Sequence, residues 1–270
     1  MAQEVDSVEV AGLTVAYQRV GNGPPLVLLH GAYEDSRIWN RQLEGLSDEF
    51  TVIAWDAPGC GHSDDSPESF TAAHYGDCLA GFLDALQLTD PAVLGLSWGS
   101  TLALELYHRH PDSAASLILA SAYAGWAGSL PVEEVQRRLR QVLREVDLPA
   151  EQFVPDWIST LLTAAAPQQL VTEVSAIMCD FHPAGMRAAV HAMGAADYRD
   201  MLSSISVPTL LLYGEADVRS PVRVGQDLHA QIPGSTLVVL PGAPHLANVE
   251  APEQFNTAVR DFLSRSGAVH

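Results

Sequence analysis

The chain has 270 residues, of which 47% are hydrophobic, and 33 acidic against 14 basic residues give it a formal net charge of −19. Every basic residue is an arginine, so sites that need a lysine amine (a Walker loop, a pyridoxal Schiff base, a Ser–Lys dyad) are excluded. The negative charge disfavours nucleic acid, an anionic membrane surface and, more weakly, strongly anionic substrates.

No run of about 18 or more apolar residues predicts a membrane-spanning helix, and the acidic N-terminus lacks the features of a signal peptide. We therefore expect a cytoplasmic protein with one domain, or one domain with an insertion. The cysteines at positions 60, 78 and 179 show neither C-x-x-C spacing nor an even count. They predict reduced thiols and no metal site.

Apolar runs alternate with helical patterns along most of the chain. Strands are predicted at residues 8–20 (a hairpin), 26–29, 51–55, 92–94, 117–120, 209–213 and 237–240. Helices are predicted at residues 37–46, 70–88, 98–110, 222–232 and 255–263. This alternation predicts a parallel sheet with helices on both faces.

One segment, from about Tyr123 to about Met186, breaks the alternation, because it contains only helical patterns. A helical insertion after the sixth strand would form a lid over the sheet. We therefore divide the chain into a first core segment (1–122), a helical lid (123–186) and a second core segment (187–270).

The stretch Gly95-Leu96-Ser97-Trp98-Gly99 lies between an apolar run and a helical pattern, which is the layout of a nucleophile elbow. Its tight turn needs glycine on both sides, and the following helix favours negative charge at its N-terminus. The motif alone is weak, since it occurs by chance in roughly one chain in ten of this length. An ordinary serine in a strand-to-loop turn is the alternative interpretation.

A serine hydroxyl needs a general base, and that base needs an orienting acid. Active-site loops of parallel sheets lie beyond the carboxyl ends of the strands. His245 follows the last predicted strand and is the candidate base. Asp217 follows the strand before it and is the candidate acid, favoured over Glu215 because a short side chain on a longer loop can turn back. The chain order of Ser97, Asp217 and His245 is that of the α/β-hydrolase triad.

The oxyanion that forms on the substrate needs amide donors. One is the backbone N–H of Trp98, directly after the nucleophile. The second should come from the loop His30-Gly31-Ala32-Tyr33 after the strand at 26–29, and we favour the N–H of Ala32.

With these residues the chain resembles the lid-bearing α/β-hydrolases, which include small esterases, lactonases and carbon–carbon bond hydrolases. The matching stretches span nearly the whole chain and are Leu28–Gly31, Asp56–Ser63, Gly95–Gly99, Gly214–Asp217, Pro244–Leu246 and Glu250–Glu253. The resemblance implies an α/β fold with a mostly parallel central sheet of about eight strands, helices on both faces and a helical lid after strand 6. It also implies that Asp56–Ser63 is a structural turn, so that Cys60 and His62 are not a catalytic pair.

Two subfamilies fit less well. The elbow also resembles that of prolyl aminopeptidases, but the oxyanion loop lacks their proline, and Ala57-Pro58 stands where they usually carry an arginine. Haloalkane dehalogenases and epoxide hydrolases need an aspartate at the position of Ser97.

We therefore expect a serine hydrolase that cleaves a small, mainly uncharged carboxylic ester or lactone through an acyl-enzyme on Ser97, without cofactor or metal. Large apolar residues of the lid favour such a substrate, and Tyr33, Trp126 and Trp157 are the candidate pocket residues. The alternatives are a carbon–carbon bond hydrolase or a prolyl-aminopeptidase-like enzyme on the same triad, or a ligand-binding signalling protein with slow turnover. The sequence leaves the oligomeric state open.

Overall fold

The computed structural model describes residues 4–266 and contains a single eight-stranded sheet with the strand order β1-β2-β4-β3-β5-β6-β7-β8. The strands are β1 (Asp6–Val10), β2 (Leu13–Val20), β3 (Pro25–Leu29), β4 (Thr51–Trp55), β5 (Ala92–Leu96), β6 (Ser116–Ala120), β7 (Thr209–Gly214) and β8 (Thr236–Leu240). Only β2 runs antiparallel to its neighbours, β1 and β4, whereas all other pairs are parallel. The predicted N-terminal hairpin and parallel sheet are confirmed.

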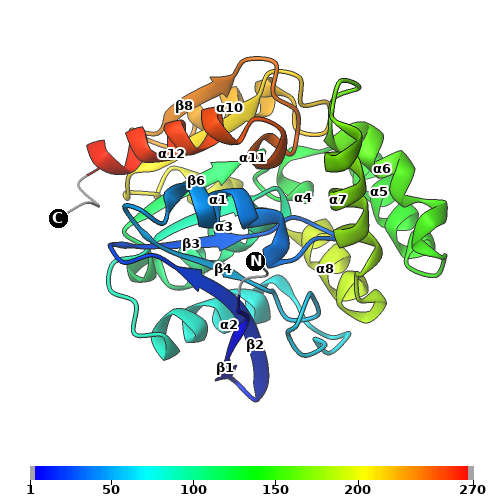
Figure 1. The fold of residues 1–270 in the computed structure, drawn as a ribbon, viewed down its shortest axis with the longest axis horizontal. Helices are drawn as coiled ribbons and strands as arrows, with labels where there is room; N and C mark the ends of the chain where they lie inside the picture. The colour runs from blue at the N-terminus through cyan, green and yellow to red at the C-terminus, as the bar shows by residue number, and fades with distance from the viewer. Residues whose placement is uncertain (1–3, 267–270) are drawn as a thin grey trace.

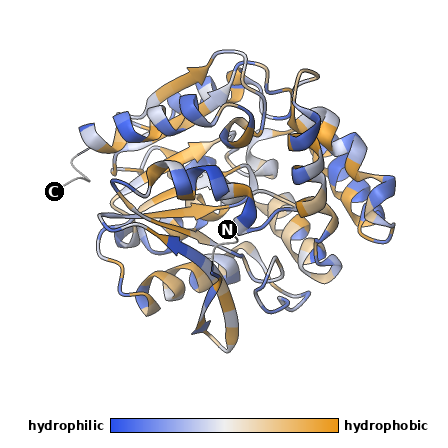
Figure 2. Ribbon diagram, viewed as in Figure 1, coloured by the Kyte–Doolittle hydropathy of each residue, from blue (hydrophilic) through white to orange (hydrophobic). Residues whose placement is uncertain are grey.

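The central strands are built from continuous apolar runs because both of their faces are covered. Every residue of β4, β5, β6 and β7 is buried. In Figure 2 these strands are mostly orange, whereas the helices around them carry blue stretches. In register, Leu94 of β5 lies between Leu28 of β3 and Ile118 of β6. The core is therefore continuous across the sheet.

Helices cover both faces of the sheet (Figure 1). Those of the core are α1 (Asn40–Leu46), α2 (Ala72–Ala85), α3 (Trp98–Arg109), α10 (Val222–His229), α11 (Ala247–Glu250) and α12 (Pro252–Arg265). Helix α1 packs against α12, and α2 packs against α3 on the opposite face. The helix expected from residue 37 differs in its start, because the Asp35 side chain accepts the Arg37 N–H and opens a 3-10 turn at Ser36–Trp39.

The expected helical insertion follows β6 and lies beyond the carboxyl ends of the strands (Figure 1). Its helices are α4 (Trp126–Ser129), α5 (Val132–Glu145), α6 (Val154–Leu161), α7 (Gln168–Cys179) and α8 (Pro183–Ala195), followed by the short α9 (Arg199–Leu202). A domain boundary at residue 186 would cut α8, whose residues pack against α4 and α5. The division into core and lid remains our proposal, with the lid extended to the end of α8.

The three cysteines, all among the described residues, form no disulfide with one another. Among residues 4–266, no helix has the length and apolar character that crossing a bilayer requires.

The burial of the central strands predicts a stability difference between two equal truncations. Val93 in β5 is fully buried, whereas Val239 in β8 is 37% exposed. We expect Val93→Ala to lower the free energy of unfolding by about 2 kcal/mol, because it removes two buried methyl groups and leaves a cavity. Val239→Ala removes the same atoms and should cost less than about 1 kcal/mol. Urea denaturation measures both, and equal losses would contradict the packing described.

Candidate active site

Ser97 occupies a strained turn between β5 and α3. Its backbone has φ 53° and ψ −109°, in a region that non-glycine residues rarely adopt. A Cβ atom on Gly95 would overlap the carbonyl of Gly99, and one on Gly99 would overlap the carbonyl of Leu29. The two glycines therefore permit the close approach of the helix to the strands, which is the structural reason for the elbow pattern.

Asp217 and His245, the candidate acid and base, are in direct contact. Nδ1 of His245 lies 2.9 Å from Oδ2 of Asp217, and both side chains are buried. The same carboxyl oxygen accepts the Ser121 hydroxyl at 2.8 Å. The other oxygen, Oδ1, accepts the backbone N–H groups of Arg219 and Ser220, each at 2.8 Å. Asp217 is thus a buried carboxylate with four donors around it.

These contacts determine the charge of Asp217. Burial alone would raise its pKa, but the opposing attraction of His245 and the hydrogen bonds outweigh burial and lower the pKa below its ordinary value. An ionised Asp217 holds the proton of His245 on Nδ1, which leaves Nε2 free to accept a proton. Glu215, the weaker alternative, is exposed, and its carboxylate accepts the Gly242 N–H at 2.9 Å.

Ser97 and His245 line the same cavity. Within residues 4–266 the Ser97 hydroxyl forms no hydrogen bond, so its proton transfer to His245 stays a prediction that requires the two groups to approach during reaction. No group of three or more His, Cys, Asp or Glu side chains in this part of the chain has an arrangement that would hold a metal ion.

The backbone N–H groups of Ala32 and Trp98, the predicted oxyanion donors, belong to residues that line this cavity. Trp98 is the first residue of α3, so its N–H has no acceptor inside the helix. Their role as an oxyanion hole stays a prediction.

His30 holds the loop that carries Ala32. Its Nδ1 lies 2.8 Å from the carbonyl oxygen of Gly31, and its Nε2 accepts the N–H of Ala57 at 3.1 Å. Nδ1 therefore carries the proton, and burial lowers the pKa of the ring, which keeps it neutral. The Gly31 carbonyl and the Ala32 N–H belong to one planar peptide unit, so the imidazole fixes the direction of both.

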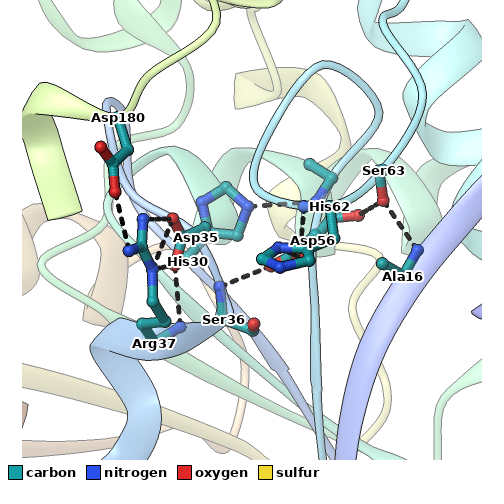
Figure 3. A network of polar contacts seen from close by, with 10 residues as sticks. Ala16, His30, Asp35, Ser36, Arg37, Asp56, His62, Ser63 and Asp180 are labelled. Carbon is teal, nitrogen blue, oxygen red and sulfur yellow. Dashed lines mark hydrogen bonds and ion pairs between the residues drawn. The ribbon is translucent and has the colours of Figure 1, made fainter. Parts of the chain in front are cut away.

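A further set of polar contacts joins this loop to the turn after β4 (Figure 3). Asp56 accepts the backbone N–H of Ser36 at 2.7 Å and that of His62 at 2.9 Å. The Ser63 hydroxyl donates to the Asp56 carbonyl at 2.7 Å. The His62 ring is largely exposed, and burial raises the pKa of the Cys60 thiol well above its ordinary value. These contacts agree with a structural turn rather than a Cys–His pair.

The cavity at Ser97 is narrow, with a volume of about 30 Å³. Trp126 and Trp157, two of the candidate pocket residues, line it. Tyr33, the third candidate, does not line it. Its ring packs against Phe153, Trp157 and Phe181 at centroid distances of 5.0 to 5.3 Å.

The sequence motifs did not reveal the charged residues of this cavity, namely Glu34, Arg138 and Arg219, or the Asp217 donor Ser121. Three of the four lie in loops directly after strands that end at the site. Position after a strand was therefore an available signal for Glu34, Ser121 and Arg219. Arg138 comes from α5 of the lid, and only the folded chain brings it to the cavity.

Glu34 is the buried carboxyl group nearest the proposed oxyanion loop. Its Oε2 accepts the Gly31 N–H at 2.8 Å. Burial is the main cause that raises its pKa to about 8, while the Gly31 hydrogen bond and the positive charge of Arg219 act in the opposite direction. Glu34 is therefore mostly protonated and neutral at pH 7.

This assignment predicts a pH effect on the expected ester hydrolysis. As pH rises through about 8, Glu34 ionises, and its negative charge opposes an oxyanion at the neighbouring amides, so kcat/KM should fall. Glu34→Gln stays neutral and should lose this alkaline decrease. Profiles of kcat/KM against pH with a short-chain ester measure it. Glu215→Gln, at an exposed glutamate, is the control, and identical profiles for wild type and Glu34→Gln would contradict the assignment.

Comparisons with known proteins agree with this architecture. A family model described as alpha/beta hydrolase fold matches residues 24–178, and one described as TAP-like protein matches residues 167–268. The pimeloyl-[acyl-carrier protein] methyl ester esterase of Vibrio parahaemolyticus is 28% identical over 91% of this chain and 96% of its own length. The 3-oxoadipate enol-lactonase 2 of Acinetobacter baylyi is 26% identical over 96% of this chain and 97% of its own.

Among solved structures, a thermophilic esterase from Thermogutta terrifontis with malate bound superposes with a TM-score of 0.89. It is 29% identical in sequence, and the match covers 97% of this chain and 99% of the esterase. The agreement extends over the sheet and the helical insertion together, since nearly all of both chains is matched.

Proposed function

This chain belongs to the alpha/beta-hydrolase family, and we propose that it is a serine hydrolase that cleaves a carboxylic ester or lactone through an acyl-enzyme on Ser97. The observation that carries the proposal is the contact of buried Asp217 with His245 at the cavity that Ser97 also lines. The narrow cavity supports a small substrate.

In the proposed reaction, His245 Nε2 takes the hydroxyl proton while Ser97 Oγ bonds to the carbonyl carbon. The amides of Ala32 and Trp98 stabilise the negative oxygen that results. The C–O bond of the ester then breaks, and His245 protonates the departing alkoxide. Water repeats the sequence on the acyl-enzyme and releases the acid. Throughout, Asp217 holds the imidazole in orientation and stabilises its protonated form.

The names of similar proteins favour ester or lactone hydrolysis over the alternatives, because the relatives include a methyl ester esterase and an enol-lactonase. Carbon–carbon or N-terminal peptide cleavage would use the same three residues. A slow ligand-binding protein would also keep them, but would show a burst of acylation with almost no steady-state turnover.

The direct test is covalent labelling. A fluorophosphonate probe should modify Ser97, as mapped by mass spectrometry, and Ser97→Ala should abolish both labelling and hydrolysis of short-chain 4-nitrophenyl esters. Ser203→Ala, at an exposed serine, is the matched control and should change neither. Label on another serine, or turnover that survives in Ser97→Ala, would overturn the proposal. Release of proline from a chromogenic amide without ester turnover would favour the peptidase alternative.

The role of the acid gives a second test. Asp217→Asn should lower kcat for ester hydrolysis at least about 100-fold, because the amide no longer selects the imidazole tautomer or stabilises its charge. Circular dichroism should show a folded protein, since the asparagine can still accept the amides of Arg219 and Ser220. Near-normal kcat would mean that the acid is misassigned.

A further inference from the structure

Two arginines lie where the cavity at Ser97 meets a second cavity of about 180 Å³. Arg138 and Arg219 line both cavities, together with Trp126 and Trp157. A ligand with its carbonyl at Ser97 and a tail in the second cavity would therefore pass both guanidinium groups.

Arg219 carries a positive charge in a strongly acidic chain. Among residues 4–266, no carboxylate lies within 4.0 Å of its guanidinium. Every other arginine either has such a partner or has an exposed side chain, whereas Arg219 is half-buried. Burial, with the nearby charge of Arg138, lowers its pKa to about 10, while the more distant carboxylates of Asp217 and Glu145 act in the opposite direction, so Arg219 remains charged at neutral pH. A charge that is partly removed from water and has no carboxylate partner has lost hydration, and an anionic ligand would compensate that loss.

The guanidinium of Arg219 is held in one orientation. It stacks on the ring of Trp157 at 3.9 Å from the centroid, and Nη1 donates to the Thr160 hydroxyl at 3.0 Å. Trp157 is in turn anchored through its Nε1, which donates to the buried Glu145 at 2.9 Å. These contacts use one N–H of the guanidinium, and the planar group is fixed before a ligand arrives.

Arg138 approaches the same space from α5. Its Nε donates to Glu134 at 2.8 Å, and its guanidinium lies 5.6 Å from the ring centre of Tyr123 and 5.7 Å from that of Trp126. Because Arg138 already has a carboxylate partner, Arg219 is the main candidate for pairing with a ligand.

We propose that Arg219, assisted by Arg138, is a carboxylate-binding subsite, and that the substrate is an ester or lactone that carries a free carboxylate. This inference rests on the proposed function of the Ser97 cavity. Arginine pairs with carboxylates through two parallel N–H donors, which fits a stacked and oriented guanidinium. The proposed anionic substrate replaces the expectation of a mainly uncharged one, because the charges nearest to the cavity determine its electrostatic potential more than the net charge of the chain does.

The test compares substrates that differ only in charge. Monomethyl esters of C4 to C6 dicarboxylic acids are measured against the methyl esters of the corresponding monoamides. For the wild type we expect kcat/KM to be at least about tenfold higher for the anionic ester of the best-fitting length, and Arg219→Gln should remove this preference. Arg219→Lys keeps the charge without the paired donors and should restore part of it.

Arg223→Gln is the matched control, because Arg223 is 88% exposed and the substitution changes the net charge equally. It should leave the preference unchanged. Equal kcat/KM for the anionic and amide esters in the wild type would overturn the subsite, as would an equal loss for both in Arg219→Gln, which would indicate only a structural contact with the lid. A different result would overturn the proposed function and not the subsite: methyl ester hydrolysis that survives in Ser97→Ala.

Discussion

A carboxylate can be buried only where hydrogen-bond donors replace the water it has lost, and this constraint organises the site around Asp217. Its donors come from the segments after β6, after β7 and after β8. The three strands are neighbours in the parallel sheet and end at the same edge. The sheet therefore positions the proposed acid and base by the geometry of its strand ends.

The nucleophile depends on a second backbone constraint. Helix α3 begins directly after β5, and the turn is so tight that only glycine fits at positions 95 and 99. The strained backbone of Ser97 is maintained by the surrounding core, in which β5 is buried along its full length. The neutral imidazole of His30 fixes the loop after β3 through hydrogen bonds with the Gly31 carbonyl and the Ala57 N–H. Both sides of the proposed oxyanion site are thus held by buried structure.

The insertion supplies the other wall of the cavity and much of its charge. Arg138 and Trp157 come from the inserted helices, whereas Arg219 and Glu34 come from loops of the core. The stack of Arg219 on Trp157 joins the two parts directly at the cavity. A whole-chain charge of −19 says little about such a site, because burial and neighbouring groups determine the charge of each residue there.

By itself the sequence determined the order of strands and helices, the parallel sheet, the glycine-flanked elbow and the nomination of Asp217 and His245 as candidate acid and base, since each rests on local patterns or on position after a strand. Only the tertiary structure decided that Tyr33 lies outside the lining of the cavity, that burial raises the pKa of Glu34 to about 8, and that no carboxylate among residues 4–266 pairs with Arg219. The burial and the partners of a residue depend on segments far apart in the chain. Here Arg219 of a core loop contacts Trp157 and Thr160 of α6 in the insertion, and no local sequence pattern predicts that contact.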